Sequence, residues 1–260
     1  MNAPVLGVIP ARIGSSRLPR KPLFPIAGRP LIEWVWRRAV GLAVFDTVVV
    51  ATDDEEVARA CRGFGATVRV TDPEHPSGTD RVAEVARDPA FRDFPTIVNV
   101  QGDEPFLLAE HAEAAAALVR DGGWELGTVA TPIRARAEWM EASVVKVVRG
   151  DDGAALLFSR APVPHPRDAE PDFTGTLFLR HVGLYAYTRE ALQRWVALPE
   201  GVLERTERLE QLRPLAAGVR MGVAVGAPAE GGVDTPADAE RAARILASMN
   251  PSPAAERAST

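Results

Sequence analysis

The sequence predicts an α/β protein with a mostly parallel sheet that helices cover on both faces. Short apolar or β-branched runs alternate with helical stretches of about ten residues through the first half of the chain. Runs that are apolar along their whole length are typical of parallel strands buried on both faces. Polar loops follow several of these runs. Because ligands of such sheets bind where the strands end, we expect the site at that edge.

In the first half, strands are expected at Val5–Ile9, Thr47–Ala51, Thr67–Val70, Thr96–Val100 and Gly127–Ile133. The helices between them are expected at Leu31–Val40, Asp54–Phe64, Thr79–Arg87 and Leu108–Arg120. Thr52 and Glu55 have the spacing of a capping box at the second helix. That box explains the acidic cluster there without any catalytic role.

The second half changes character. Three expected strands follow one another without full helices between them, which indicates an antiparallel extension: Val144–Val148, Ala155–Ser159 and Val182–Tyr187. The long segment Pro162–Arg180 holds four prolines and is typical of a lid or a subunit contact. A helix at Leu203–Arg213 that Pro214 ends or kinks, a strand at Met221–Val225 and a helix at Pro236–Ala247 complete the chain.

Composition excludes several classes of protein. The formal charge is −5 and no long basic stripe lies outside the first loop, which argues against nucleic-acid binding. Cys61 is the single cysteine, so intrachain disulfides and multi-cysteine zinc sites are excluded and a reducing cytoplasm fits. The sequence has no apolar run long enough to span a membrane and no signal peptide, so we expect neither a membrane protein nor secretion. Residues 250–260 are expected to form a flexible tail.

The first loop, Ile9–Pro25, concentrates positive charge. It carries Arg12, Arg17, Arg20 and Lys21, and the first 32 residues hold five cations and no acid. A basic loop with Gly and Ser directly after a first strand is where an α/β protein would bind phosphate groups. A solvated basic N-terminus is the alternative.

This loop has neither P-loop spacing nor the dinucleotide-binding glycine pattern, which weakens ATPase and NAD-enzyme interpretations. Arg17 could grip phosphate oxygens with two N–H groups, while Lys21 supplies a point charge. Such a loop suits a triphosphate whose pyrophosphate leaves with developing negative charge.

Two further loops follow expected strands. Ser77 and Asp80 have the spacing of a capping box, yet Gly78 at the helix start hints that a ligand approaches the backbone. Asp103 follows Gln101-Gly102 at the end of a buried strand. It is either a natural Mg²⁺ ligand or an ordinary turn residue.

Asp234 precedes a helix that Thr235 and Asp238 already cap, so it is either a second metal ligand or a surface acid. Three more side chains stay ambiguous between a solvated helix face and a site, namely Glu207, Glu210 and Gln211. Arg160 and His181 beside expected strands are equally open: a surface cation and a core imidazole would explain them.

Seven segments together resemble the 3-deoxy-manno-octulosonate cytidylyltransferases, the CMP-Kdo synthetases of lipopolysaccharide assembly. The segments are IPARIGSSRLPRKPL, HPSGTDR, VNVQGDEP, LFSRAPVP, HVGLYAY, LERTERLEQLR and GVDTPADAERA. They occur in the family's order, and the resemblance as a whole runs from about Val5 to Ala247. Arg20 departs from the glycine that the family commonly has there.

The resemblance implies that CTP and Kdo react to CMP-Kdo and pyrophosphate with Mg²⁺, in a homodimer of the cytoplasm. It implies one Rossmann-like nucleotidyltransferase domain, residues 1–249, in which 135–219 serves the sugar and the dimer. By the same resemblance the CTP residues are Arg12, Ser15, Arg17, Lys21, Ser77, Gly78 and Gln101. The Mg²⁺ ligands are Asp103 and Asp234, which act in catalysis with Arg17 and Lys21, and the sugar residues are Arg160, His181, Tyr185, Glu210 and Gln211.

The implied reaction is an in-line attack of the anomeric hydroxyl of Kdo on the α-phosphorus of CTP. Two Mg²⁺ ions at Asp103 and Asp234 could activate the hydroxyl and neutralise the triphosphate. Three alternatives stay open: a related 2-keto sugar acid as substrate, a UTP- or TTP-dependent sugar-1-phosphate transferase, and a nucleotide sensor without catalysis. The first needs a panel of sugar acids, the second a comparison of CTP with UTP, and the third an assay of pyrophosphate release.

Overall fold

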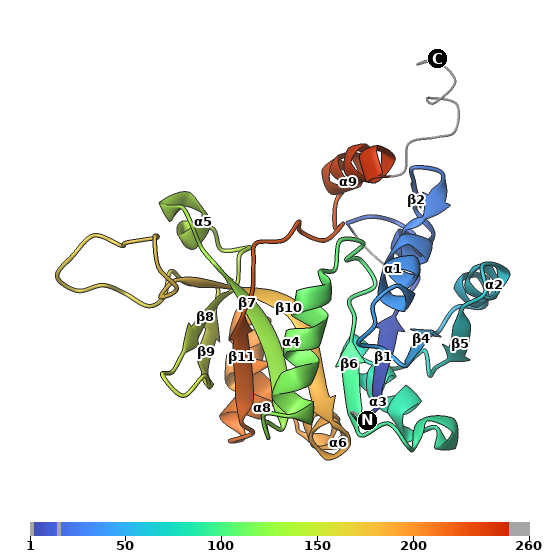
Figure 1. Ribbon diagram of the computed structural model, residues 1–260, viewed down its shortest axis with the longest axis horizontal. Helices are drawn as coiled ribbons and strands as arrows, with labels where there is room; N and C mark the ends of the chain where they lie inside the picture. The colour runs from blue at the N-terminus through green and yellow to red at the C-terminus, as the bar shows by residue number, and fades with distance from the viewer. Residues whose placement is uncertain (1–2, 15–16, 250–260) are drawn as a thin grey trace.

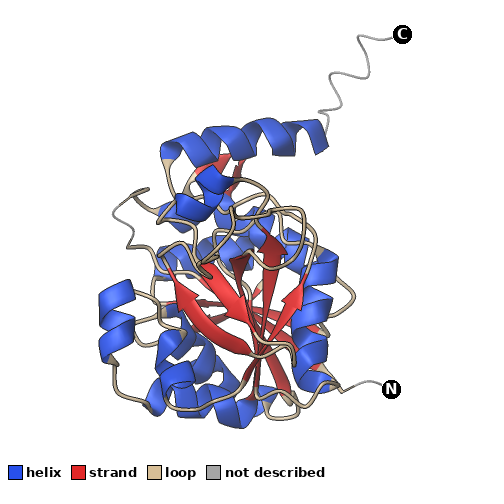
Figure 2. Ribbon diagram, turned by 90° about the vertical axis from the view of Figure 1, so that its left-hand side faces the viewer, coloured by secondary structure: helices blue, strands red, loops and turns tan. Residues whose placement is uncertain are grey.

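A computed structural model describes residues 3–14 and 17–249 of the 260 residues. The main feature is a nine-stranded sheet whose central path runs β11-β7-β10-β6-β1-β4-β5. The bounds of these strands are β1 (Val5–Pro10), β4 (Thr47–Thr52), β5 (Thr67–Val70), β6 (Thr96–Asn99), β7 (Leu126–Pro132), β10 (Leu179–Thr188) and β11 (Met221–Val225). Figure 2 shows these strands fanned between helices on both sides.

The first half of the sheet is parallel, as the apolar runs predict. β1 pairs in parallel with β4 on one side, where Val8 lies opposite Val49, and with β6 on the other. Both Val8 and Val49 are fully buried, because helices cover each face of the sheet here. The carboxyl ends of β1 and β6 therefore lie side by side.

The antiparallel part is placed differently from the expectation. The strand expected at Val182–Tyr187 is the longer β10, and it lies inside the main sheet between β6 and β7, antiparallel to both. The hairpin of β8 (Lys146–Arg149) and β9 (Ala155–Ser159) forms the extension, attached through β8 to β10. The segment after β9 projects from the body of the molecule (Figure 1).

Helices pack on both faces of the sheet. Apolar residues of α1 (Leu31–Val40), α2 (Glu55–Gly63) and α4 (Ala109–Arg120) belong to one core cluster, and those of α3 (Gly78–Arg87), α6 (Arg189–Ala197) and α8 (Leu212–Ala216) to another. Figure 1 shows α4 in front of the sheet and α9 (Pro236–Met249) beyond the carboxyl ends of the strands, beside β2 (Pro25–Ile26). The remaining elements are β3 (Arg29–Pro30), α5 (Arg136–Met140), α7 (Val202–Glu207) and the 3₁₀ turns η1 (Lys21–Leu23) and η2 (Pro89–Phe91).

One of the three expected capping boxes is confirmed in full, because Thr235 and Asp238 bond reciprocally at the start of α9. At α3 the N-cap is confirmed: Ser77 accepts from the Asp80 N–H, while its hydroxyl donates to the Asp80 carboxylate. The box at Thr52 is wrong, because Asp54 caps α2 and accepts from the second and third residues of that helix. Asp is as good an N-cap as Thr, and it stands one residue before the helix.

The single helix expected at Leu203–Arg213 is wrong as well. α7 ends at Glu207, and Arg208 has a left-handed backbone with φ of 52°. The chain then resumes as α8, which contains Pro214 in its first turn, where no intrahelical N–H bond is lost. The break turns Glu210 and Gln211 toward the sheet.

Among residues 3–14 and 17–249, no helix has the length and apolar character needed to cross a membrane.

Candidate active site

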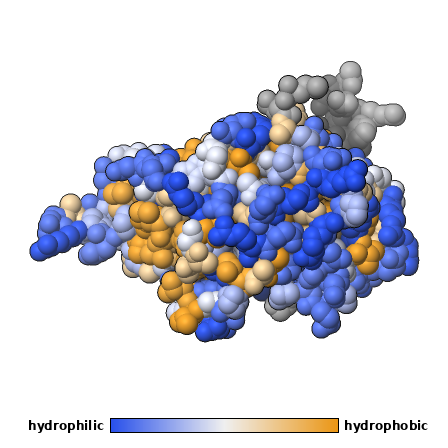
Figure 3. Space-filling view, turned by 90° about the horizontal axis from the view of Figure 1, so that it is seen from below, coloured by the Kyte–Doolittle hydropathy of each residue, from blue (hydrophilic) through white to orange (hydrophobic). Residues whose placement is uncertain are grey.

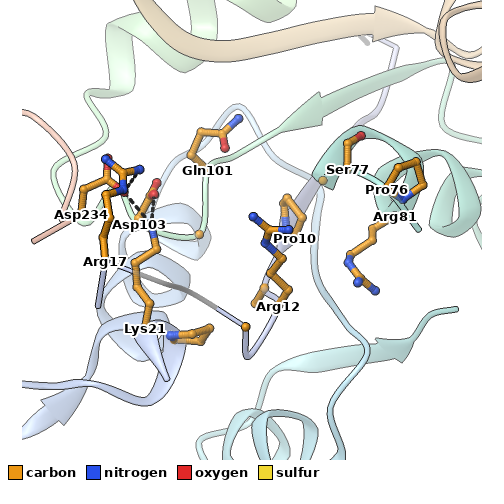
Figure 4. A pocket seen from close by; sticks show the side chains of 15 residues that line it. Pro10, Arg12, Arg17, Lys21, Pro76, Ser77, Arg81, Gln101, Asp103 and Asp234 are labelled. Carbon is orange, nitrogen blue, oxygen red and sulfur yellow. Dashed lines mark hydrogen bonds and ion pairs between the residues drawn. The ribbon is translucent and has the colours of Figure 1, made fainter. Parts of the chain in front are cut away.

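An outer cavity of about 680 Å³ lies at the carboxyl ends of β1 and β6, under the loop that follows β1. Its charged lining residues are Arg12, Arg17, Lys21, Arg81, Asp103 and Asp234. They come from four separate segments of the chain, and Figure 4 shows Arg17, Lys21, Asp103 and Asp234 converging on one side of the cavity. The sheet edge therefore brings together the segments that the sequence singled out.

Lys21 bridges the two aspartates. Its Nζ lies 2.5 Å from Asp103 Oδ2 and 2.9 Å from Asp234 Oδ1. Arg17 Nη2 donates to the same Asp234 oxygen at 2.9 Å. Burial alone would lower the pKa of Lys21, but the Asp103 and Asp234 carboxylates outweigh it and raise that pKa. Lys21 is thus a firmly charged ammonium.

The charges of Asp103 and Asp234 also affect the pKa of the neighbouring Glu104. Burial and the negative charge of Asp103 raise the pKa of Glu104 to about 7. Arg180 opposes this shift, and Asp234 adds to it. The acids are therefore close enough to repel one another, and a cation between them is favoured.

The pair Asp103 and Asp234 fits a divalent metal ion. Their carboxylates converge on one point that the Lys21 ammonium occupies, and carboxylate oxygens are the ligands that Mg²⁺ prefers. Among the described residues no group of three or more His, Cys, Asp or Glu side chains could hold a metal. Mg²⁺ commonly binds one or two carboxylates and completes its shell with phosphate oxygens and water, so two acids suffice beside a triphosphate.

The other residues of the first loop are placed variously. Arg12 is exposed and lines the cavity together with Gly14. Ser15 lies outside the described residues. Arg20 points away from the cavity and pairs with Glu56 of α2, so its charge does not serve the site.

The far wall of the outer cavity is formed by Ser77, Gly78 and Gln101. Gly78 packs tightly on Pro10, since a Cβ at this position would lie 3.3 Å from the proline ring. Close packing of protein, and not only ligand approach, therefore explains this glycine. The Gln101 amide donates to the Gly183 carbonyl at 2.8 Å, which anchors it to the irregular part of β10.

An inner cavity of about 330 Å³ adjoins the outer one, and Gly78 and Gln101 line both. Four of the five predicted sugar residues line it, namely His181, Tyr185, Glu210 and Gln211. No Arg or Lys side chain is among its lining residues. The structure thus separates a compartment with several cations and acids from one that has no cationic side chain and is rich in hydrogen-bonding groups.

His181 is a neutral imidazole with a defined tautomer. Burial lowers its pKa to about 3. The Thr128 hydroxyl donates to the Leu184 carbonyl at 2.7 Å and lies 3.0 Å from His181 Nε2. Because the hydroxyl proton is already used, Nε2 carries the imidazole proton and Nδ1 is an acceptor.

Arg160 does not line either cavity. Its Nε donates to the Glu207 carbonyl at 2.7 Å, and Nη1 donates to the Ala142 carbonyl at 3.2 Å. Its backbone N–H also donates to the Glu207 carboxylate at 2.9 Å. These contacts fix the end of α7 just before the Arg208 break, so Arg160 supports the segment that carries Glu210. The resemblance implies that Arg160 belongs to the sugar site, but the structure does not place it in either cavity.

Sequence reasoning missed several lining residues. Among the charged residues of the outer cavity this is Arg81, which is buried and paired with Asp53 at 2.5 Å. In the inner cavity they are Thr79, Asn99, Val145, Gly183, Trp195 and Leu209. Arg81 and Asn99 lie within the segments HPSGTDR and VNVQGDEP. Their place in the same segments as predicted site residues could therefore have indicated that they line the site. Trp195 on α6 gave none.

Comparison with known proteins agrees with this geometry. Residues 6–221 match the family model described as "Cytidylyltransferase". A 3-deoxy-manno-octulosonate cytidylyltransferase of Gemmatimonas aurantiaca is 51% identical over 92% of this chain and 93% of its own length.

Solved structures support the same assignment. A CMP:2-keto-3-deoxy-manno-octonic acid synthetase in complex with CTP has a TM-score of 0.87 and 41% identity, over 95% of this chain and all of that one. A 4-diphosphocytidyl-2C-methyl-D-erythritol synthase of Anaerococcus prevotii has a TM-score of 0.62 at 15% identity, over 94% of this chain and 98% of its own, and shares the fold alone. The predicted α/β nucleotidyltransferase fold is thereby confirmed. The chain belongs to the cytidylyltransferase family, among the 3-deoxy-manno-octulosonate cytidylyltransferases.

Proposed function

We propose that this chain couples CTP to 3-deoxy-D-manno-octulosonate, giving CMP-Kdo and pyrophosphate for lipopolysaccharide biosynthesis. The observation that carries the proposal is the pair of adjoining cavities. The outer one has cations and acids for a triphosphate, and the inner one has hydrogen-bonding groups and no Arg or Lys side chain, which suits a polyhydroxylated sugar. Gly78 and Gln101 form the shared boundary, where the two reacting groups would meet.

In this proposal the chain's own residues position the reactants and balance charge. Arg12, Arg17 and Lys21 bind the triphosphate and stabilise the negative charge that the leaving pyrophosphate develops. Gln101, held by the Gly183 carbonyl, lies at the boundary between nucleotide and sugar. His181 Nδ1 offers an acceptor for a sugar hydroxyl in the inner cavity.

Mg²⁺ is the proposed cofactor, with Asp103 and Asp234 as its protein ligands. The ammonium of Lys21 between these carboxylates shows that the position favours positive charge. When bound, the ion would supply neutralisation of phosphate charge and activation of the attacking hydroxyl.

A homodimer is proposed from the apolar surface near the β8–β9 hairpin. Leu156 and Leu157 of β9 are exposed, as are Met140 of α5 and Leu177. Figure 3 views the molecule from below and shows apolar side chains gathered on its left half, the side on which Figure 1 places this hairpin. Light scattering should give twice the chain mass, and Leu156→Lys should shift it to the monomer. A monomeric unaltered protein would contradict the proposal.

A cytoplasmic location is also proposed, because Cys61 is a free, buried thiol.

The function is tested by pyrophosphate release from CTP and Kdo, with UTP and a panel of 2-keto sugar acids for comparison. We expect turnover with CTP and Kdo that EDTA abolishes and Mg²⁺ restores. Asp103→Ala and Asp234→Ala should each lose turnover by at least about a hundredfold while the circular dichroism spectrum is kept. Near-normal turnover of either variant would refute the metal assignment, and a preference for UTP would refute the function.

A further inference from the structure

The wall between the two cavities contains one hydroxyl that meets two carboxyl groups. Ser77 Oγ lies 2.6 Å from Asp80 Oδ2 and 3.0 Å from Glu210 Oε1. Ser77 lines the outer cavity, while Glu210 lines the inner one. This contact joins residues that are 133 positions apart in the chain.

The hydroxyl has too few protons for two carboxylates. Ser77 has one proton to donate and two lone pairs. The 2.6 Å contact has the length of a hydroxyl donating to an ionised carboxylate, so the proton goes to Asp80. The Asp80 N–H, at 3.3 Å, uses one lone pair. The second lone pair faces Glu210, which closes the hydrogen bond only if Glu210 donates a proton of its own.

Among residues 3–14 and 17–249, the cation that acts on Glu210 is Arg213, and it is not free to hold Glu210 ionised. Arg213 of α8 is near, but its guanidinium is engaged by Glu204 of α7 through two bonds of 2.8 Å and 2.6 Å. Burial raises the pKa of Glu210, and the negative charge of Asp80 adds to the shift. The hydroxyls of Ser77 and Thr79, and the Arg213 charge, act in the opposite direction.

The groups facing Glu210 from the sheet are uncharged. Tyr185 and Tyr187 of β10 are buried phenols, and burial raises the pKa of both. His181 of the same strand is a neutral imidazole. A proton on Glu210 therefore leaves the lining of the inner cavity without any formal charge.

We propose that Glu210 is an un-ionised carboxylic acid in the resting protein, donating to Ser77 while Ser77 donates to Asp80, and that this proton admits an anionic sugar acid to the inner cavity. The proposal rests on the function proposed above for its substrate. An ionised Glu210 would repel the substrate carboxylate across a buried cavity, where charge repulsion is weakly screened. The protonated form removes this repulsion, because its proton is held in the hydrogen bond to Ser77.

The proton itself is tested by infrared difference spectroscopy on the ligand-free full chain. The spectrum of the unaltered protein minus that of Glu210→Gln, at pH 7, should contain the C=O stretch of a protonated carboxyl that shifts in D₂O. Asp80→Asn should lose the same band. A neutral amide is a weaker acceptor for the Ser77 proton than a carboxylate, so Ser77 can donate to Glu210 instead, and Glu210 can then ionise. Glu170→Gln, at an exposed acid that pairs with Arg136 and takes no part in this cluster, is the matched control and should keep the band. Absence of the band, or its persistence in Glu210→Gln, would overturn the proposal.

The consequence for the sugar is tested by the pH dependence of KM. In the unaltered protein the KM for Kdo should rise by about tenfold toward alkaline pH as Glu210 ionises, while the KM for CTP stays constant. In Glu210→Gln the KM for Kdo should be independent of pH over the same range. A parallel alkaline rise in both proteins would overturn the selective role. If Kdo is not turned over by the unaltered protein, the proposed function fails, and the infrared band still decides whether the proton is present.

Discussion

Gly102 is a position where one methyl group should impair both stability and activity. It follows Gln101 and precedes Asp103, at the point where β6 leaves the sheet beside the end of β1. A Cβ at Gly102 would lie 2.5 Å from the carbonyl oxygen of Pro10. An ordinary van der Waals contact begins at 3.4 Å, so the two atoms must separate by about 0.9 Å (3.4 − 2.5).

The relief of this contact should fall on the loop with Asp103. The end of β1 is held by the bond from Ala11 N–H to the Ala51 carbonyl at 2.8 Å, and Val100 N–H bonds to the Val8 carbonyl at 2.9 Å. Because both strands resist movement, the shift should fall on the turn after them, which is held by the bond from Val233 N–H to the Asp103 carbonyl at 2.8 Å. Overpacking of this kind costs about 1–3 kcal/mol in the free energy of unfolding. A displacement near 1 Å of groups that position substrate lowers the rate by about a hundredfold.

Gly102→Ala is therefore expected to show both losses, measured by urea denaturation and by pyrophosphate release from CTP and Kdo. Gly63→Ala is the matched control, because a Cβ at that helical position meets nothing within 4 Å. It should keep normal turnover and gain up to about 1 kcal/mol from the helix propensity of alanine. Normal turnover and stability of Gly102→Ala would refute the argument from close approach.

Three further predictions follow from individual contacts. Arg213→Met should lower the free energy of unfolding by about 3–5 kcal/mol, because the charge of Glu204 stays buried without its partner; adding Glu204→Gln should recover most of it in urea melts. The pKa of His181 is lowered to about 3, so its contribution to stability is present above the ordinary value of 6.5 and is lost as the pH falls below it. The stability of the unaltered protein should thus fall relative to His181→Gln by up to about 1.4 kcal/mol per pH unit below pH 6.5, and parallel curves would contradict this. Arg20 has a left-handed backbone with φ of 55°, so Arg20→Gly should raise the free energy of unfolding by about 0.5–1 kcal/mol in urea melts. Arg20→Ala keeps the strained backbone and should not raise it.

The edge of the sheet where the site lies could be predicted from the sequence for a geometric reason. Parallel strands end on the same edge, so the loops after Val5–Ile9 and Thr96–Val100 had to meet once both runs were taken as parallel. The order of the strands could not be predicted, because a run such as Val182–Tyr187 is equally apolar at the edge and in the centre of a sheet. Its central position between β6 and β7 follows from contacts with distant segments.

The sugar side was less predictable because its residues depend on a backbone break. The spacing of Leu209 and Leu212 continues the helical pattern across Arg208. The sequence therefore does not indicate the left-handed backbone that Arg208 adopts. The contacts that fix this turn come from Arg160, which is 47 residues away from Glu207 in the chain. The resemblance assigned Arg160 to the sugar, whereas backbone carbonyls occupy its guanidinium.

The charges around Lys21 support the proposal that a divalent cation binds at this site together with the nucleotide. Arg17 and Lys21 contribute two positive charges, and Asp103 and Asp234 contribute two negative ones, so the interacting group is neutral in the ligand-free protein. A triphosphate added to a neutral group gains little attraction, because every ammonium or guanidinium it binds must be shared with a carboxylate. A divalent ion that takes up the two aspartates would release Lys21 and Arg17 to the phosphates. On this reasoning nucleotide affinity and metal affinity are coupled through Lys21, and the basic loop acts as a phosphate site only when its acids have another partner.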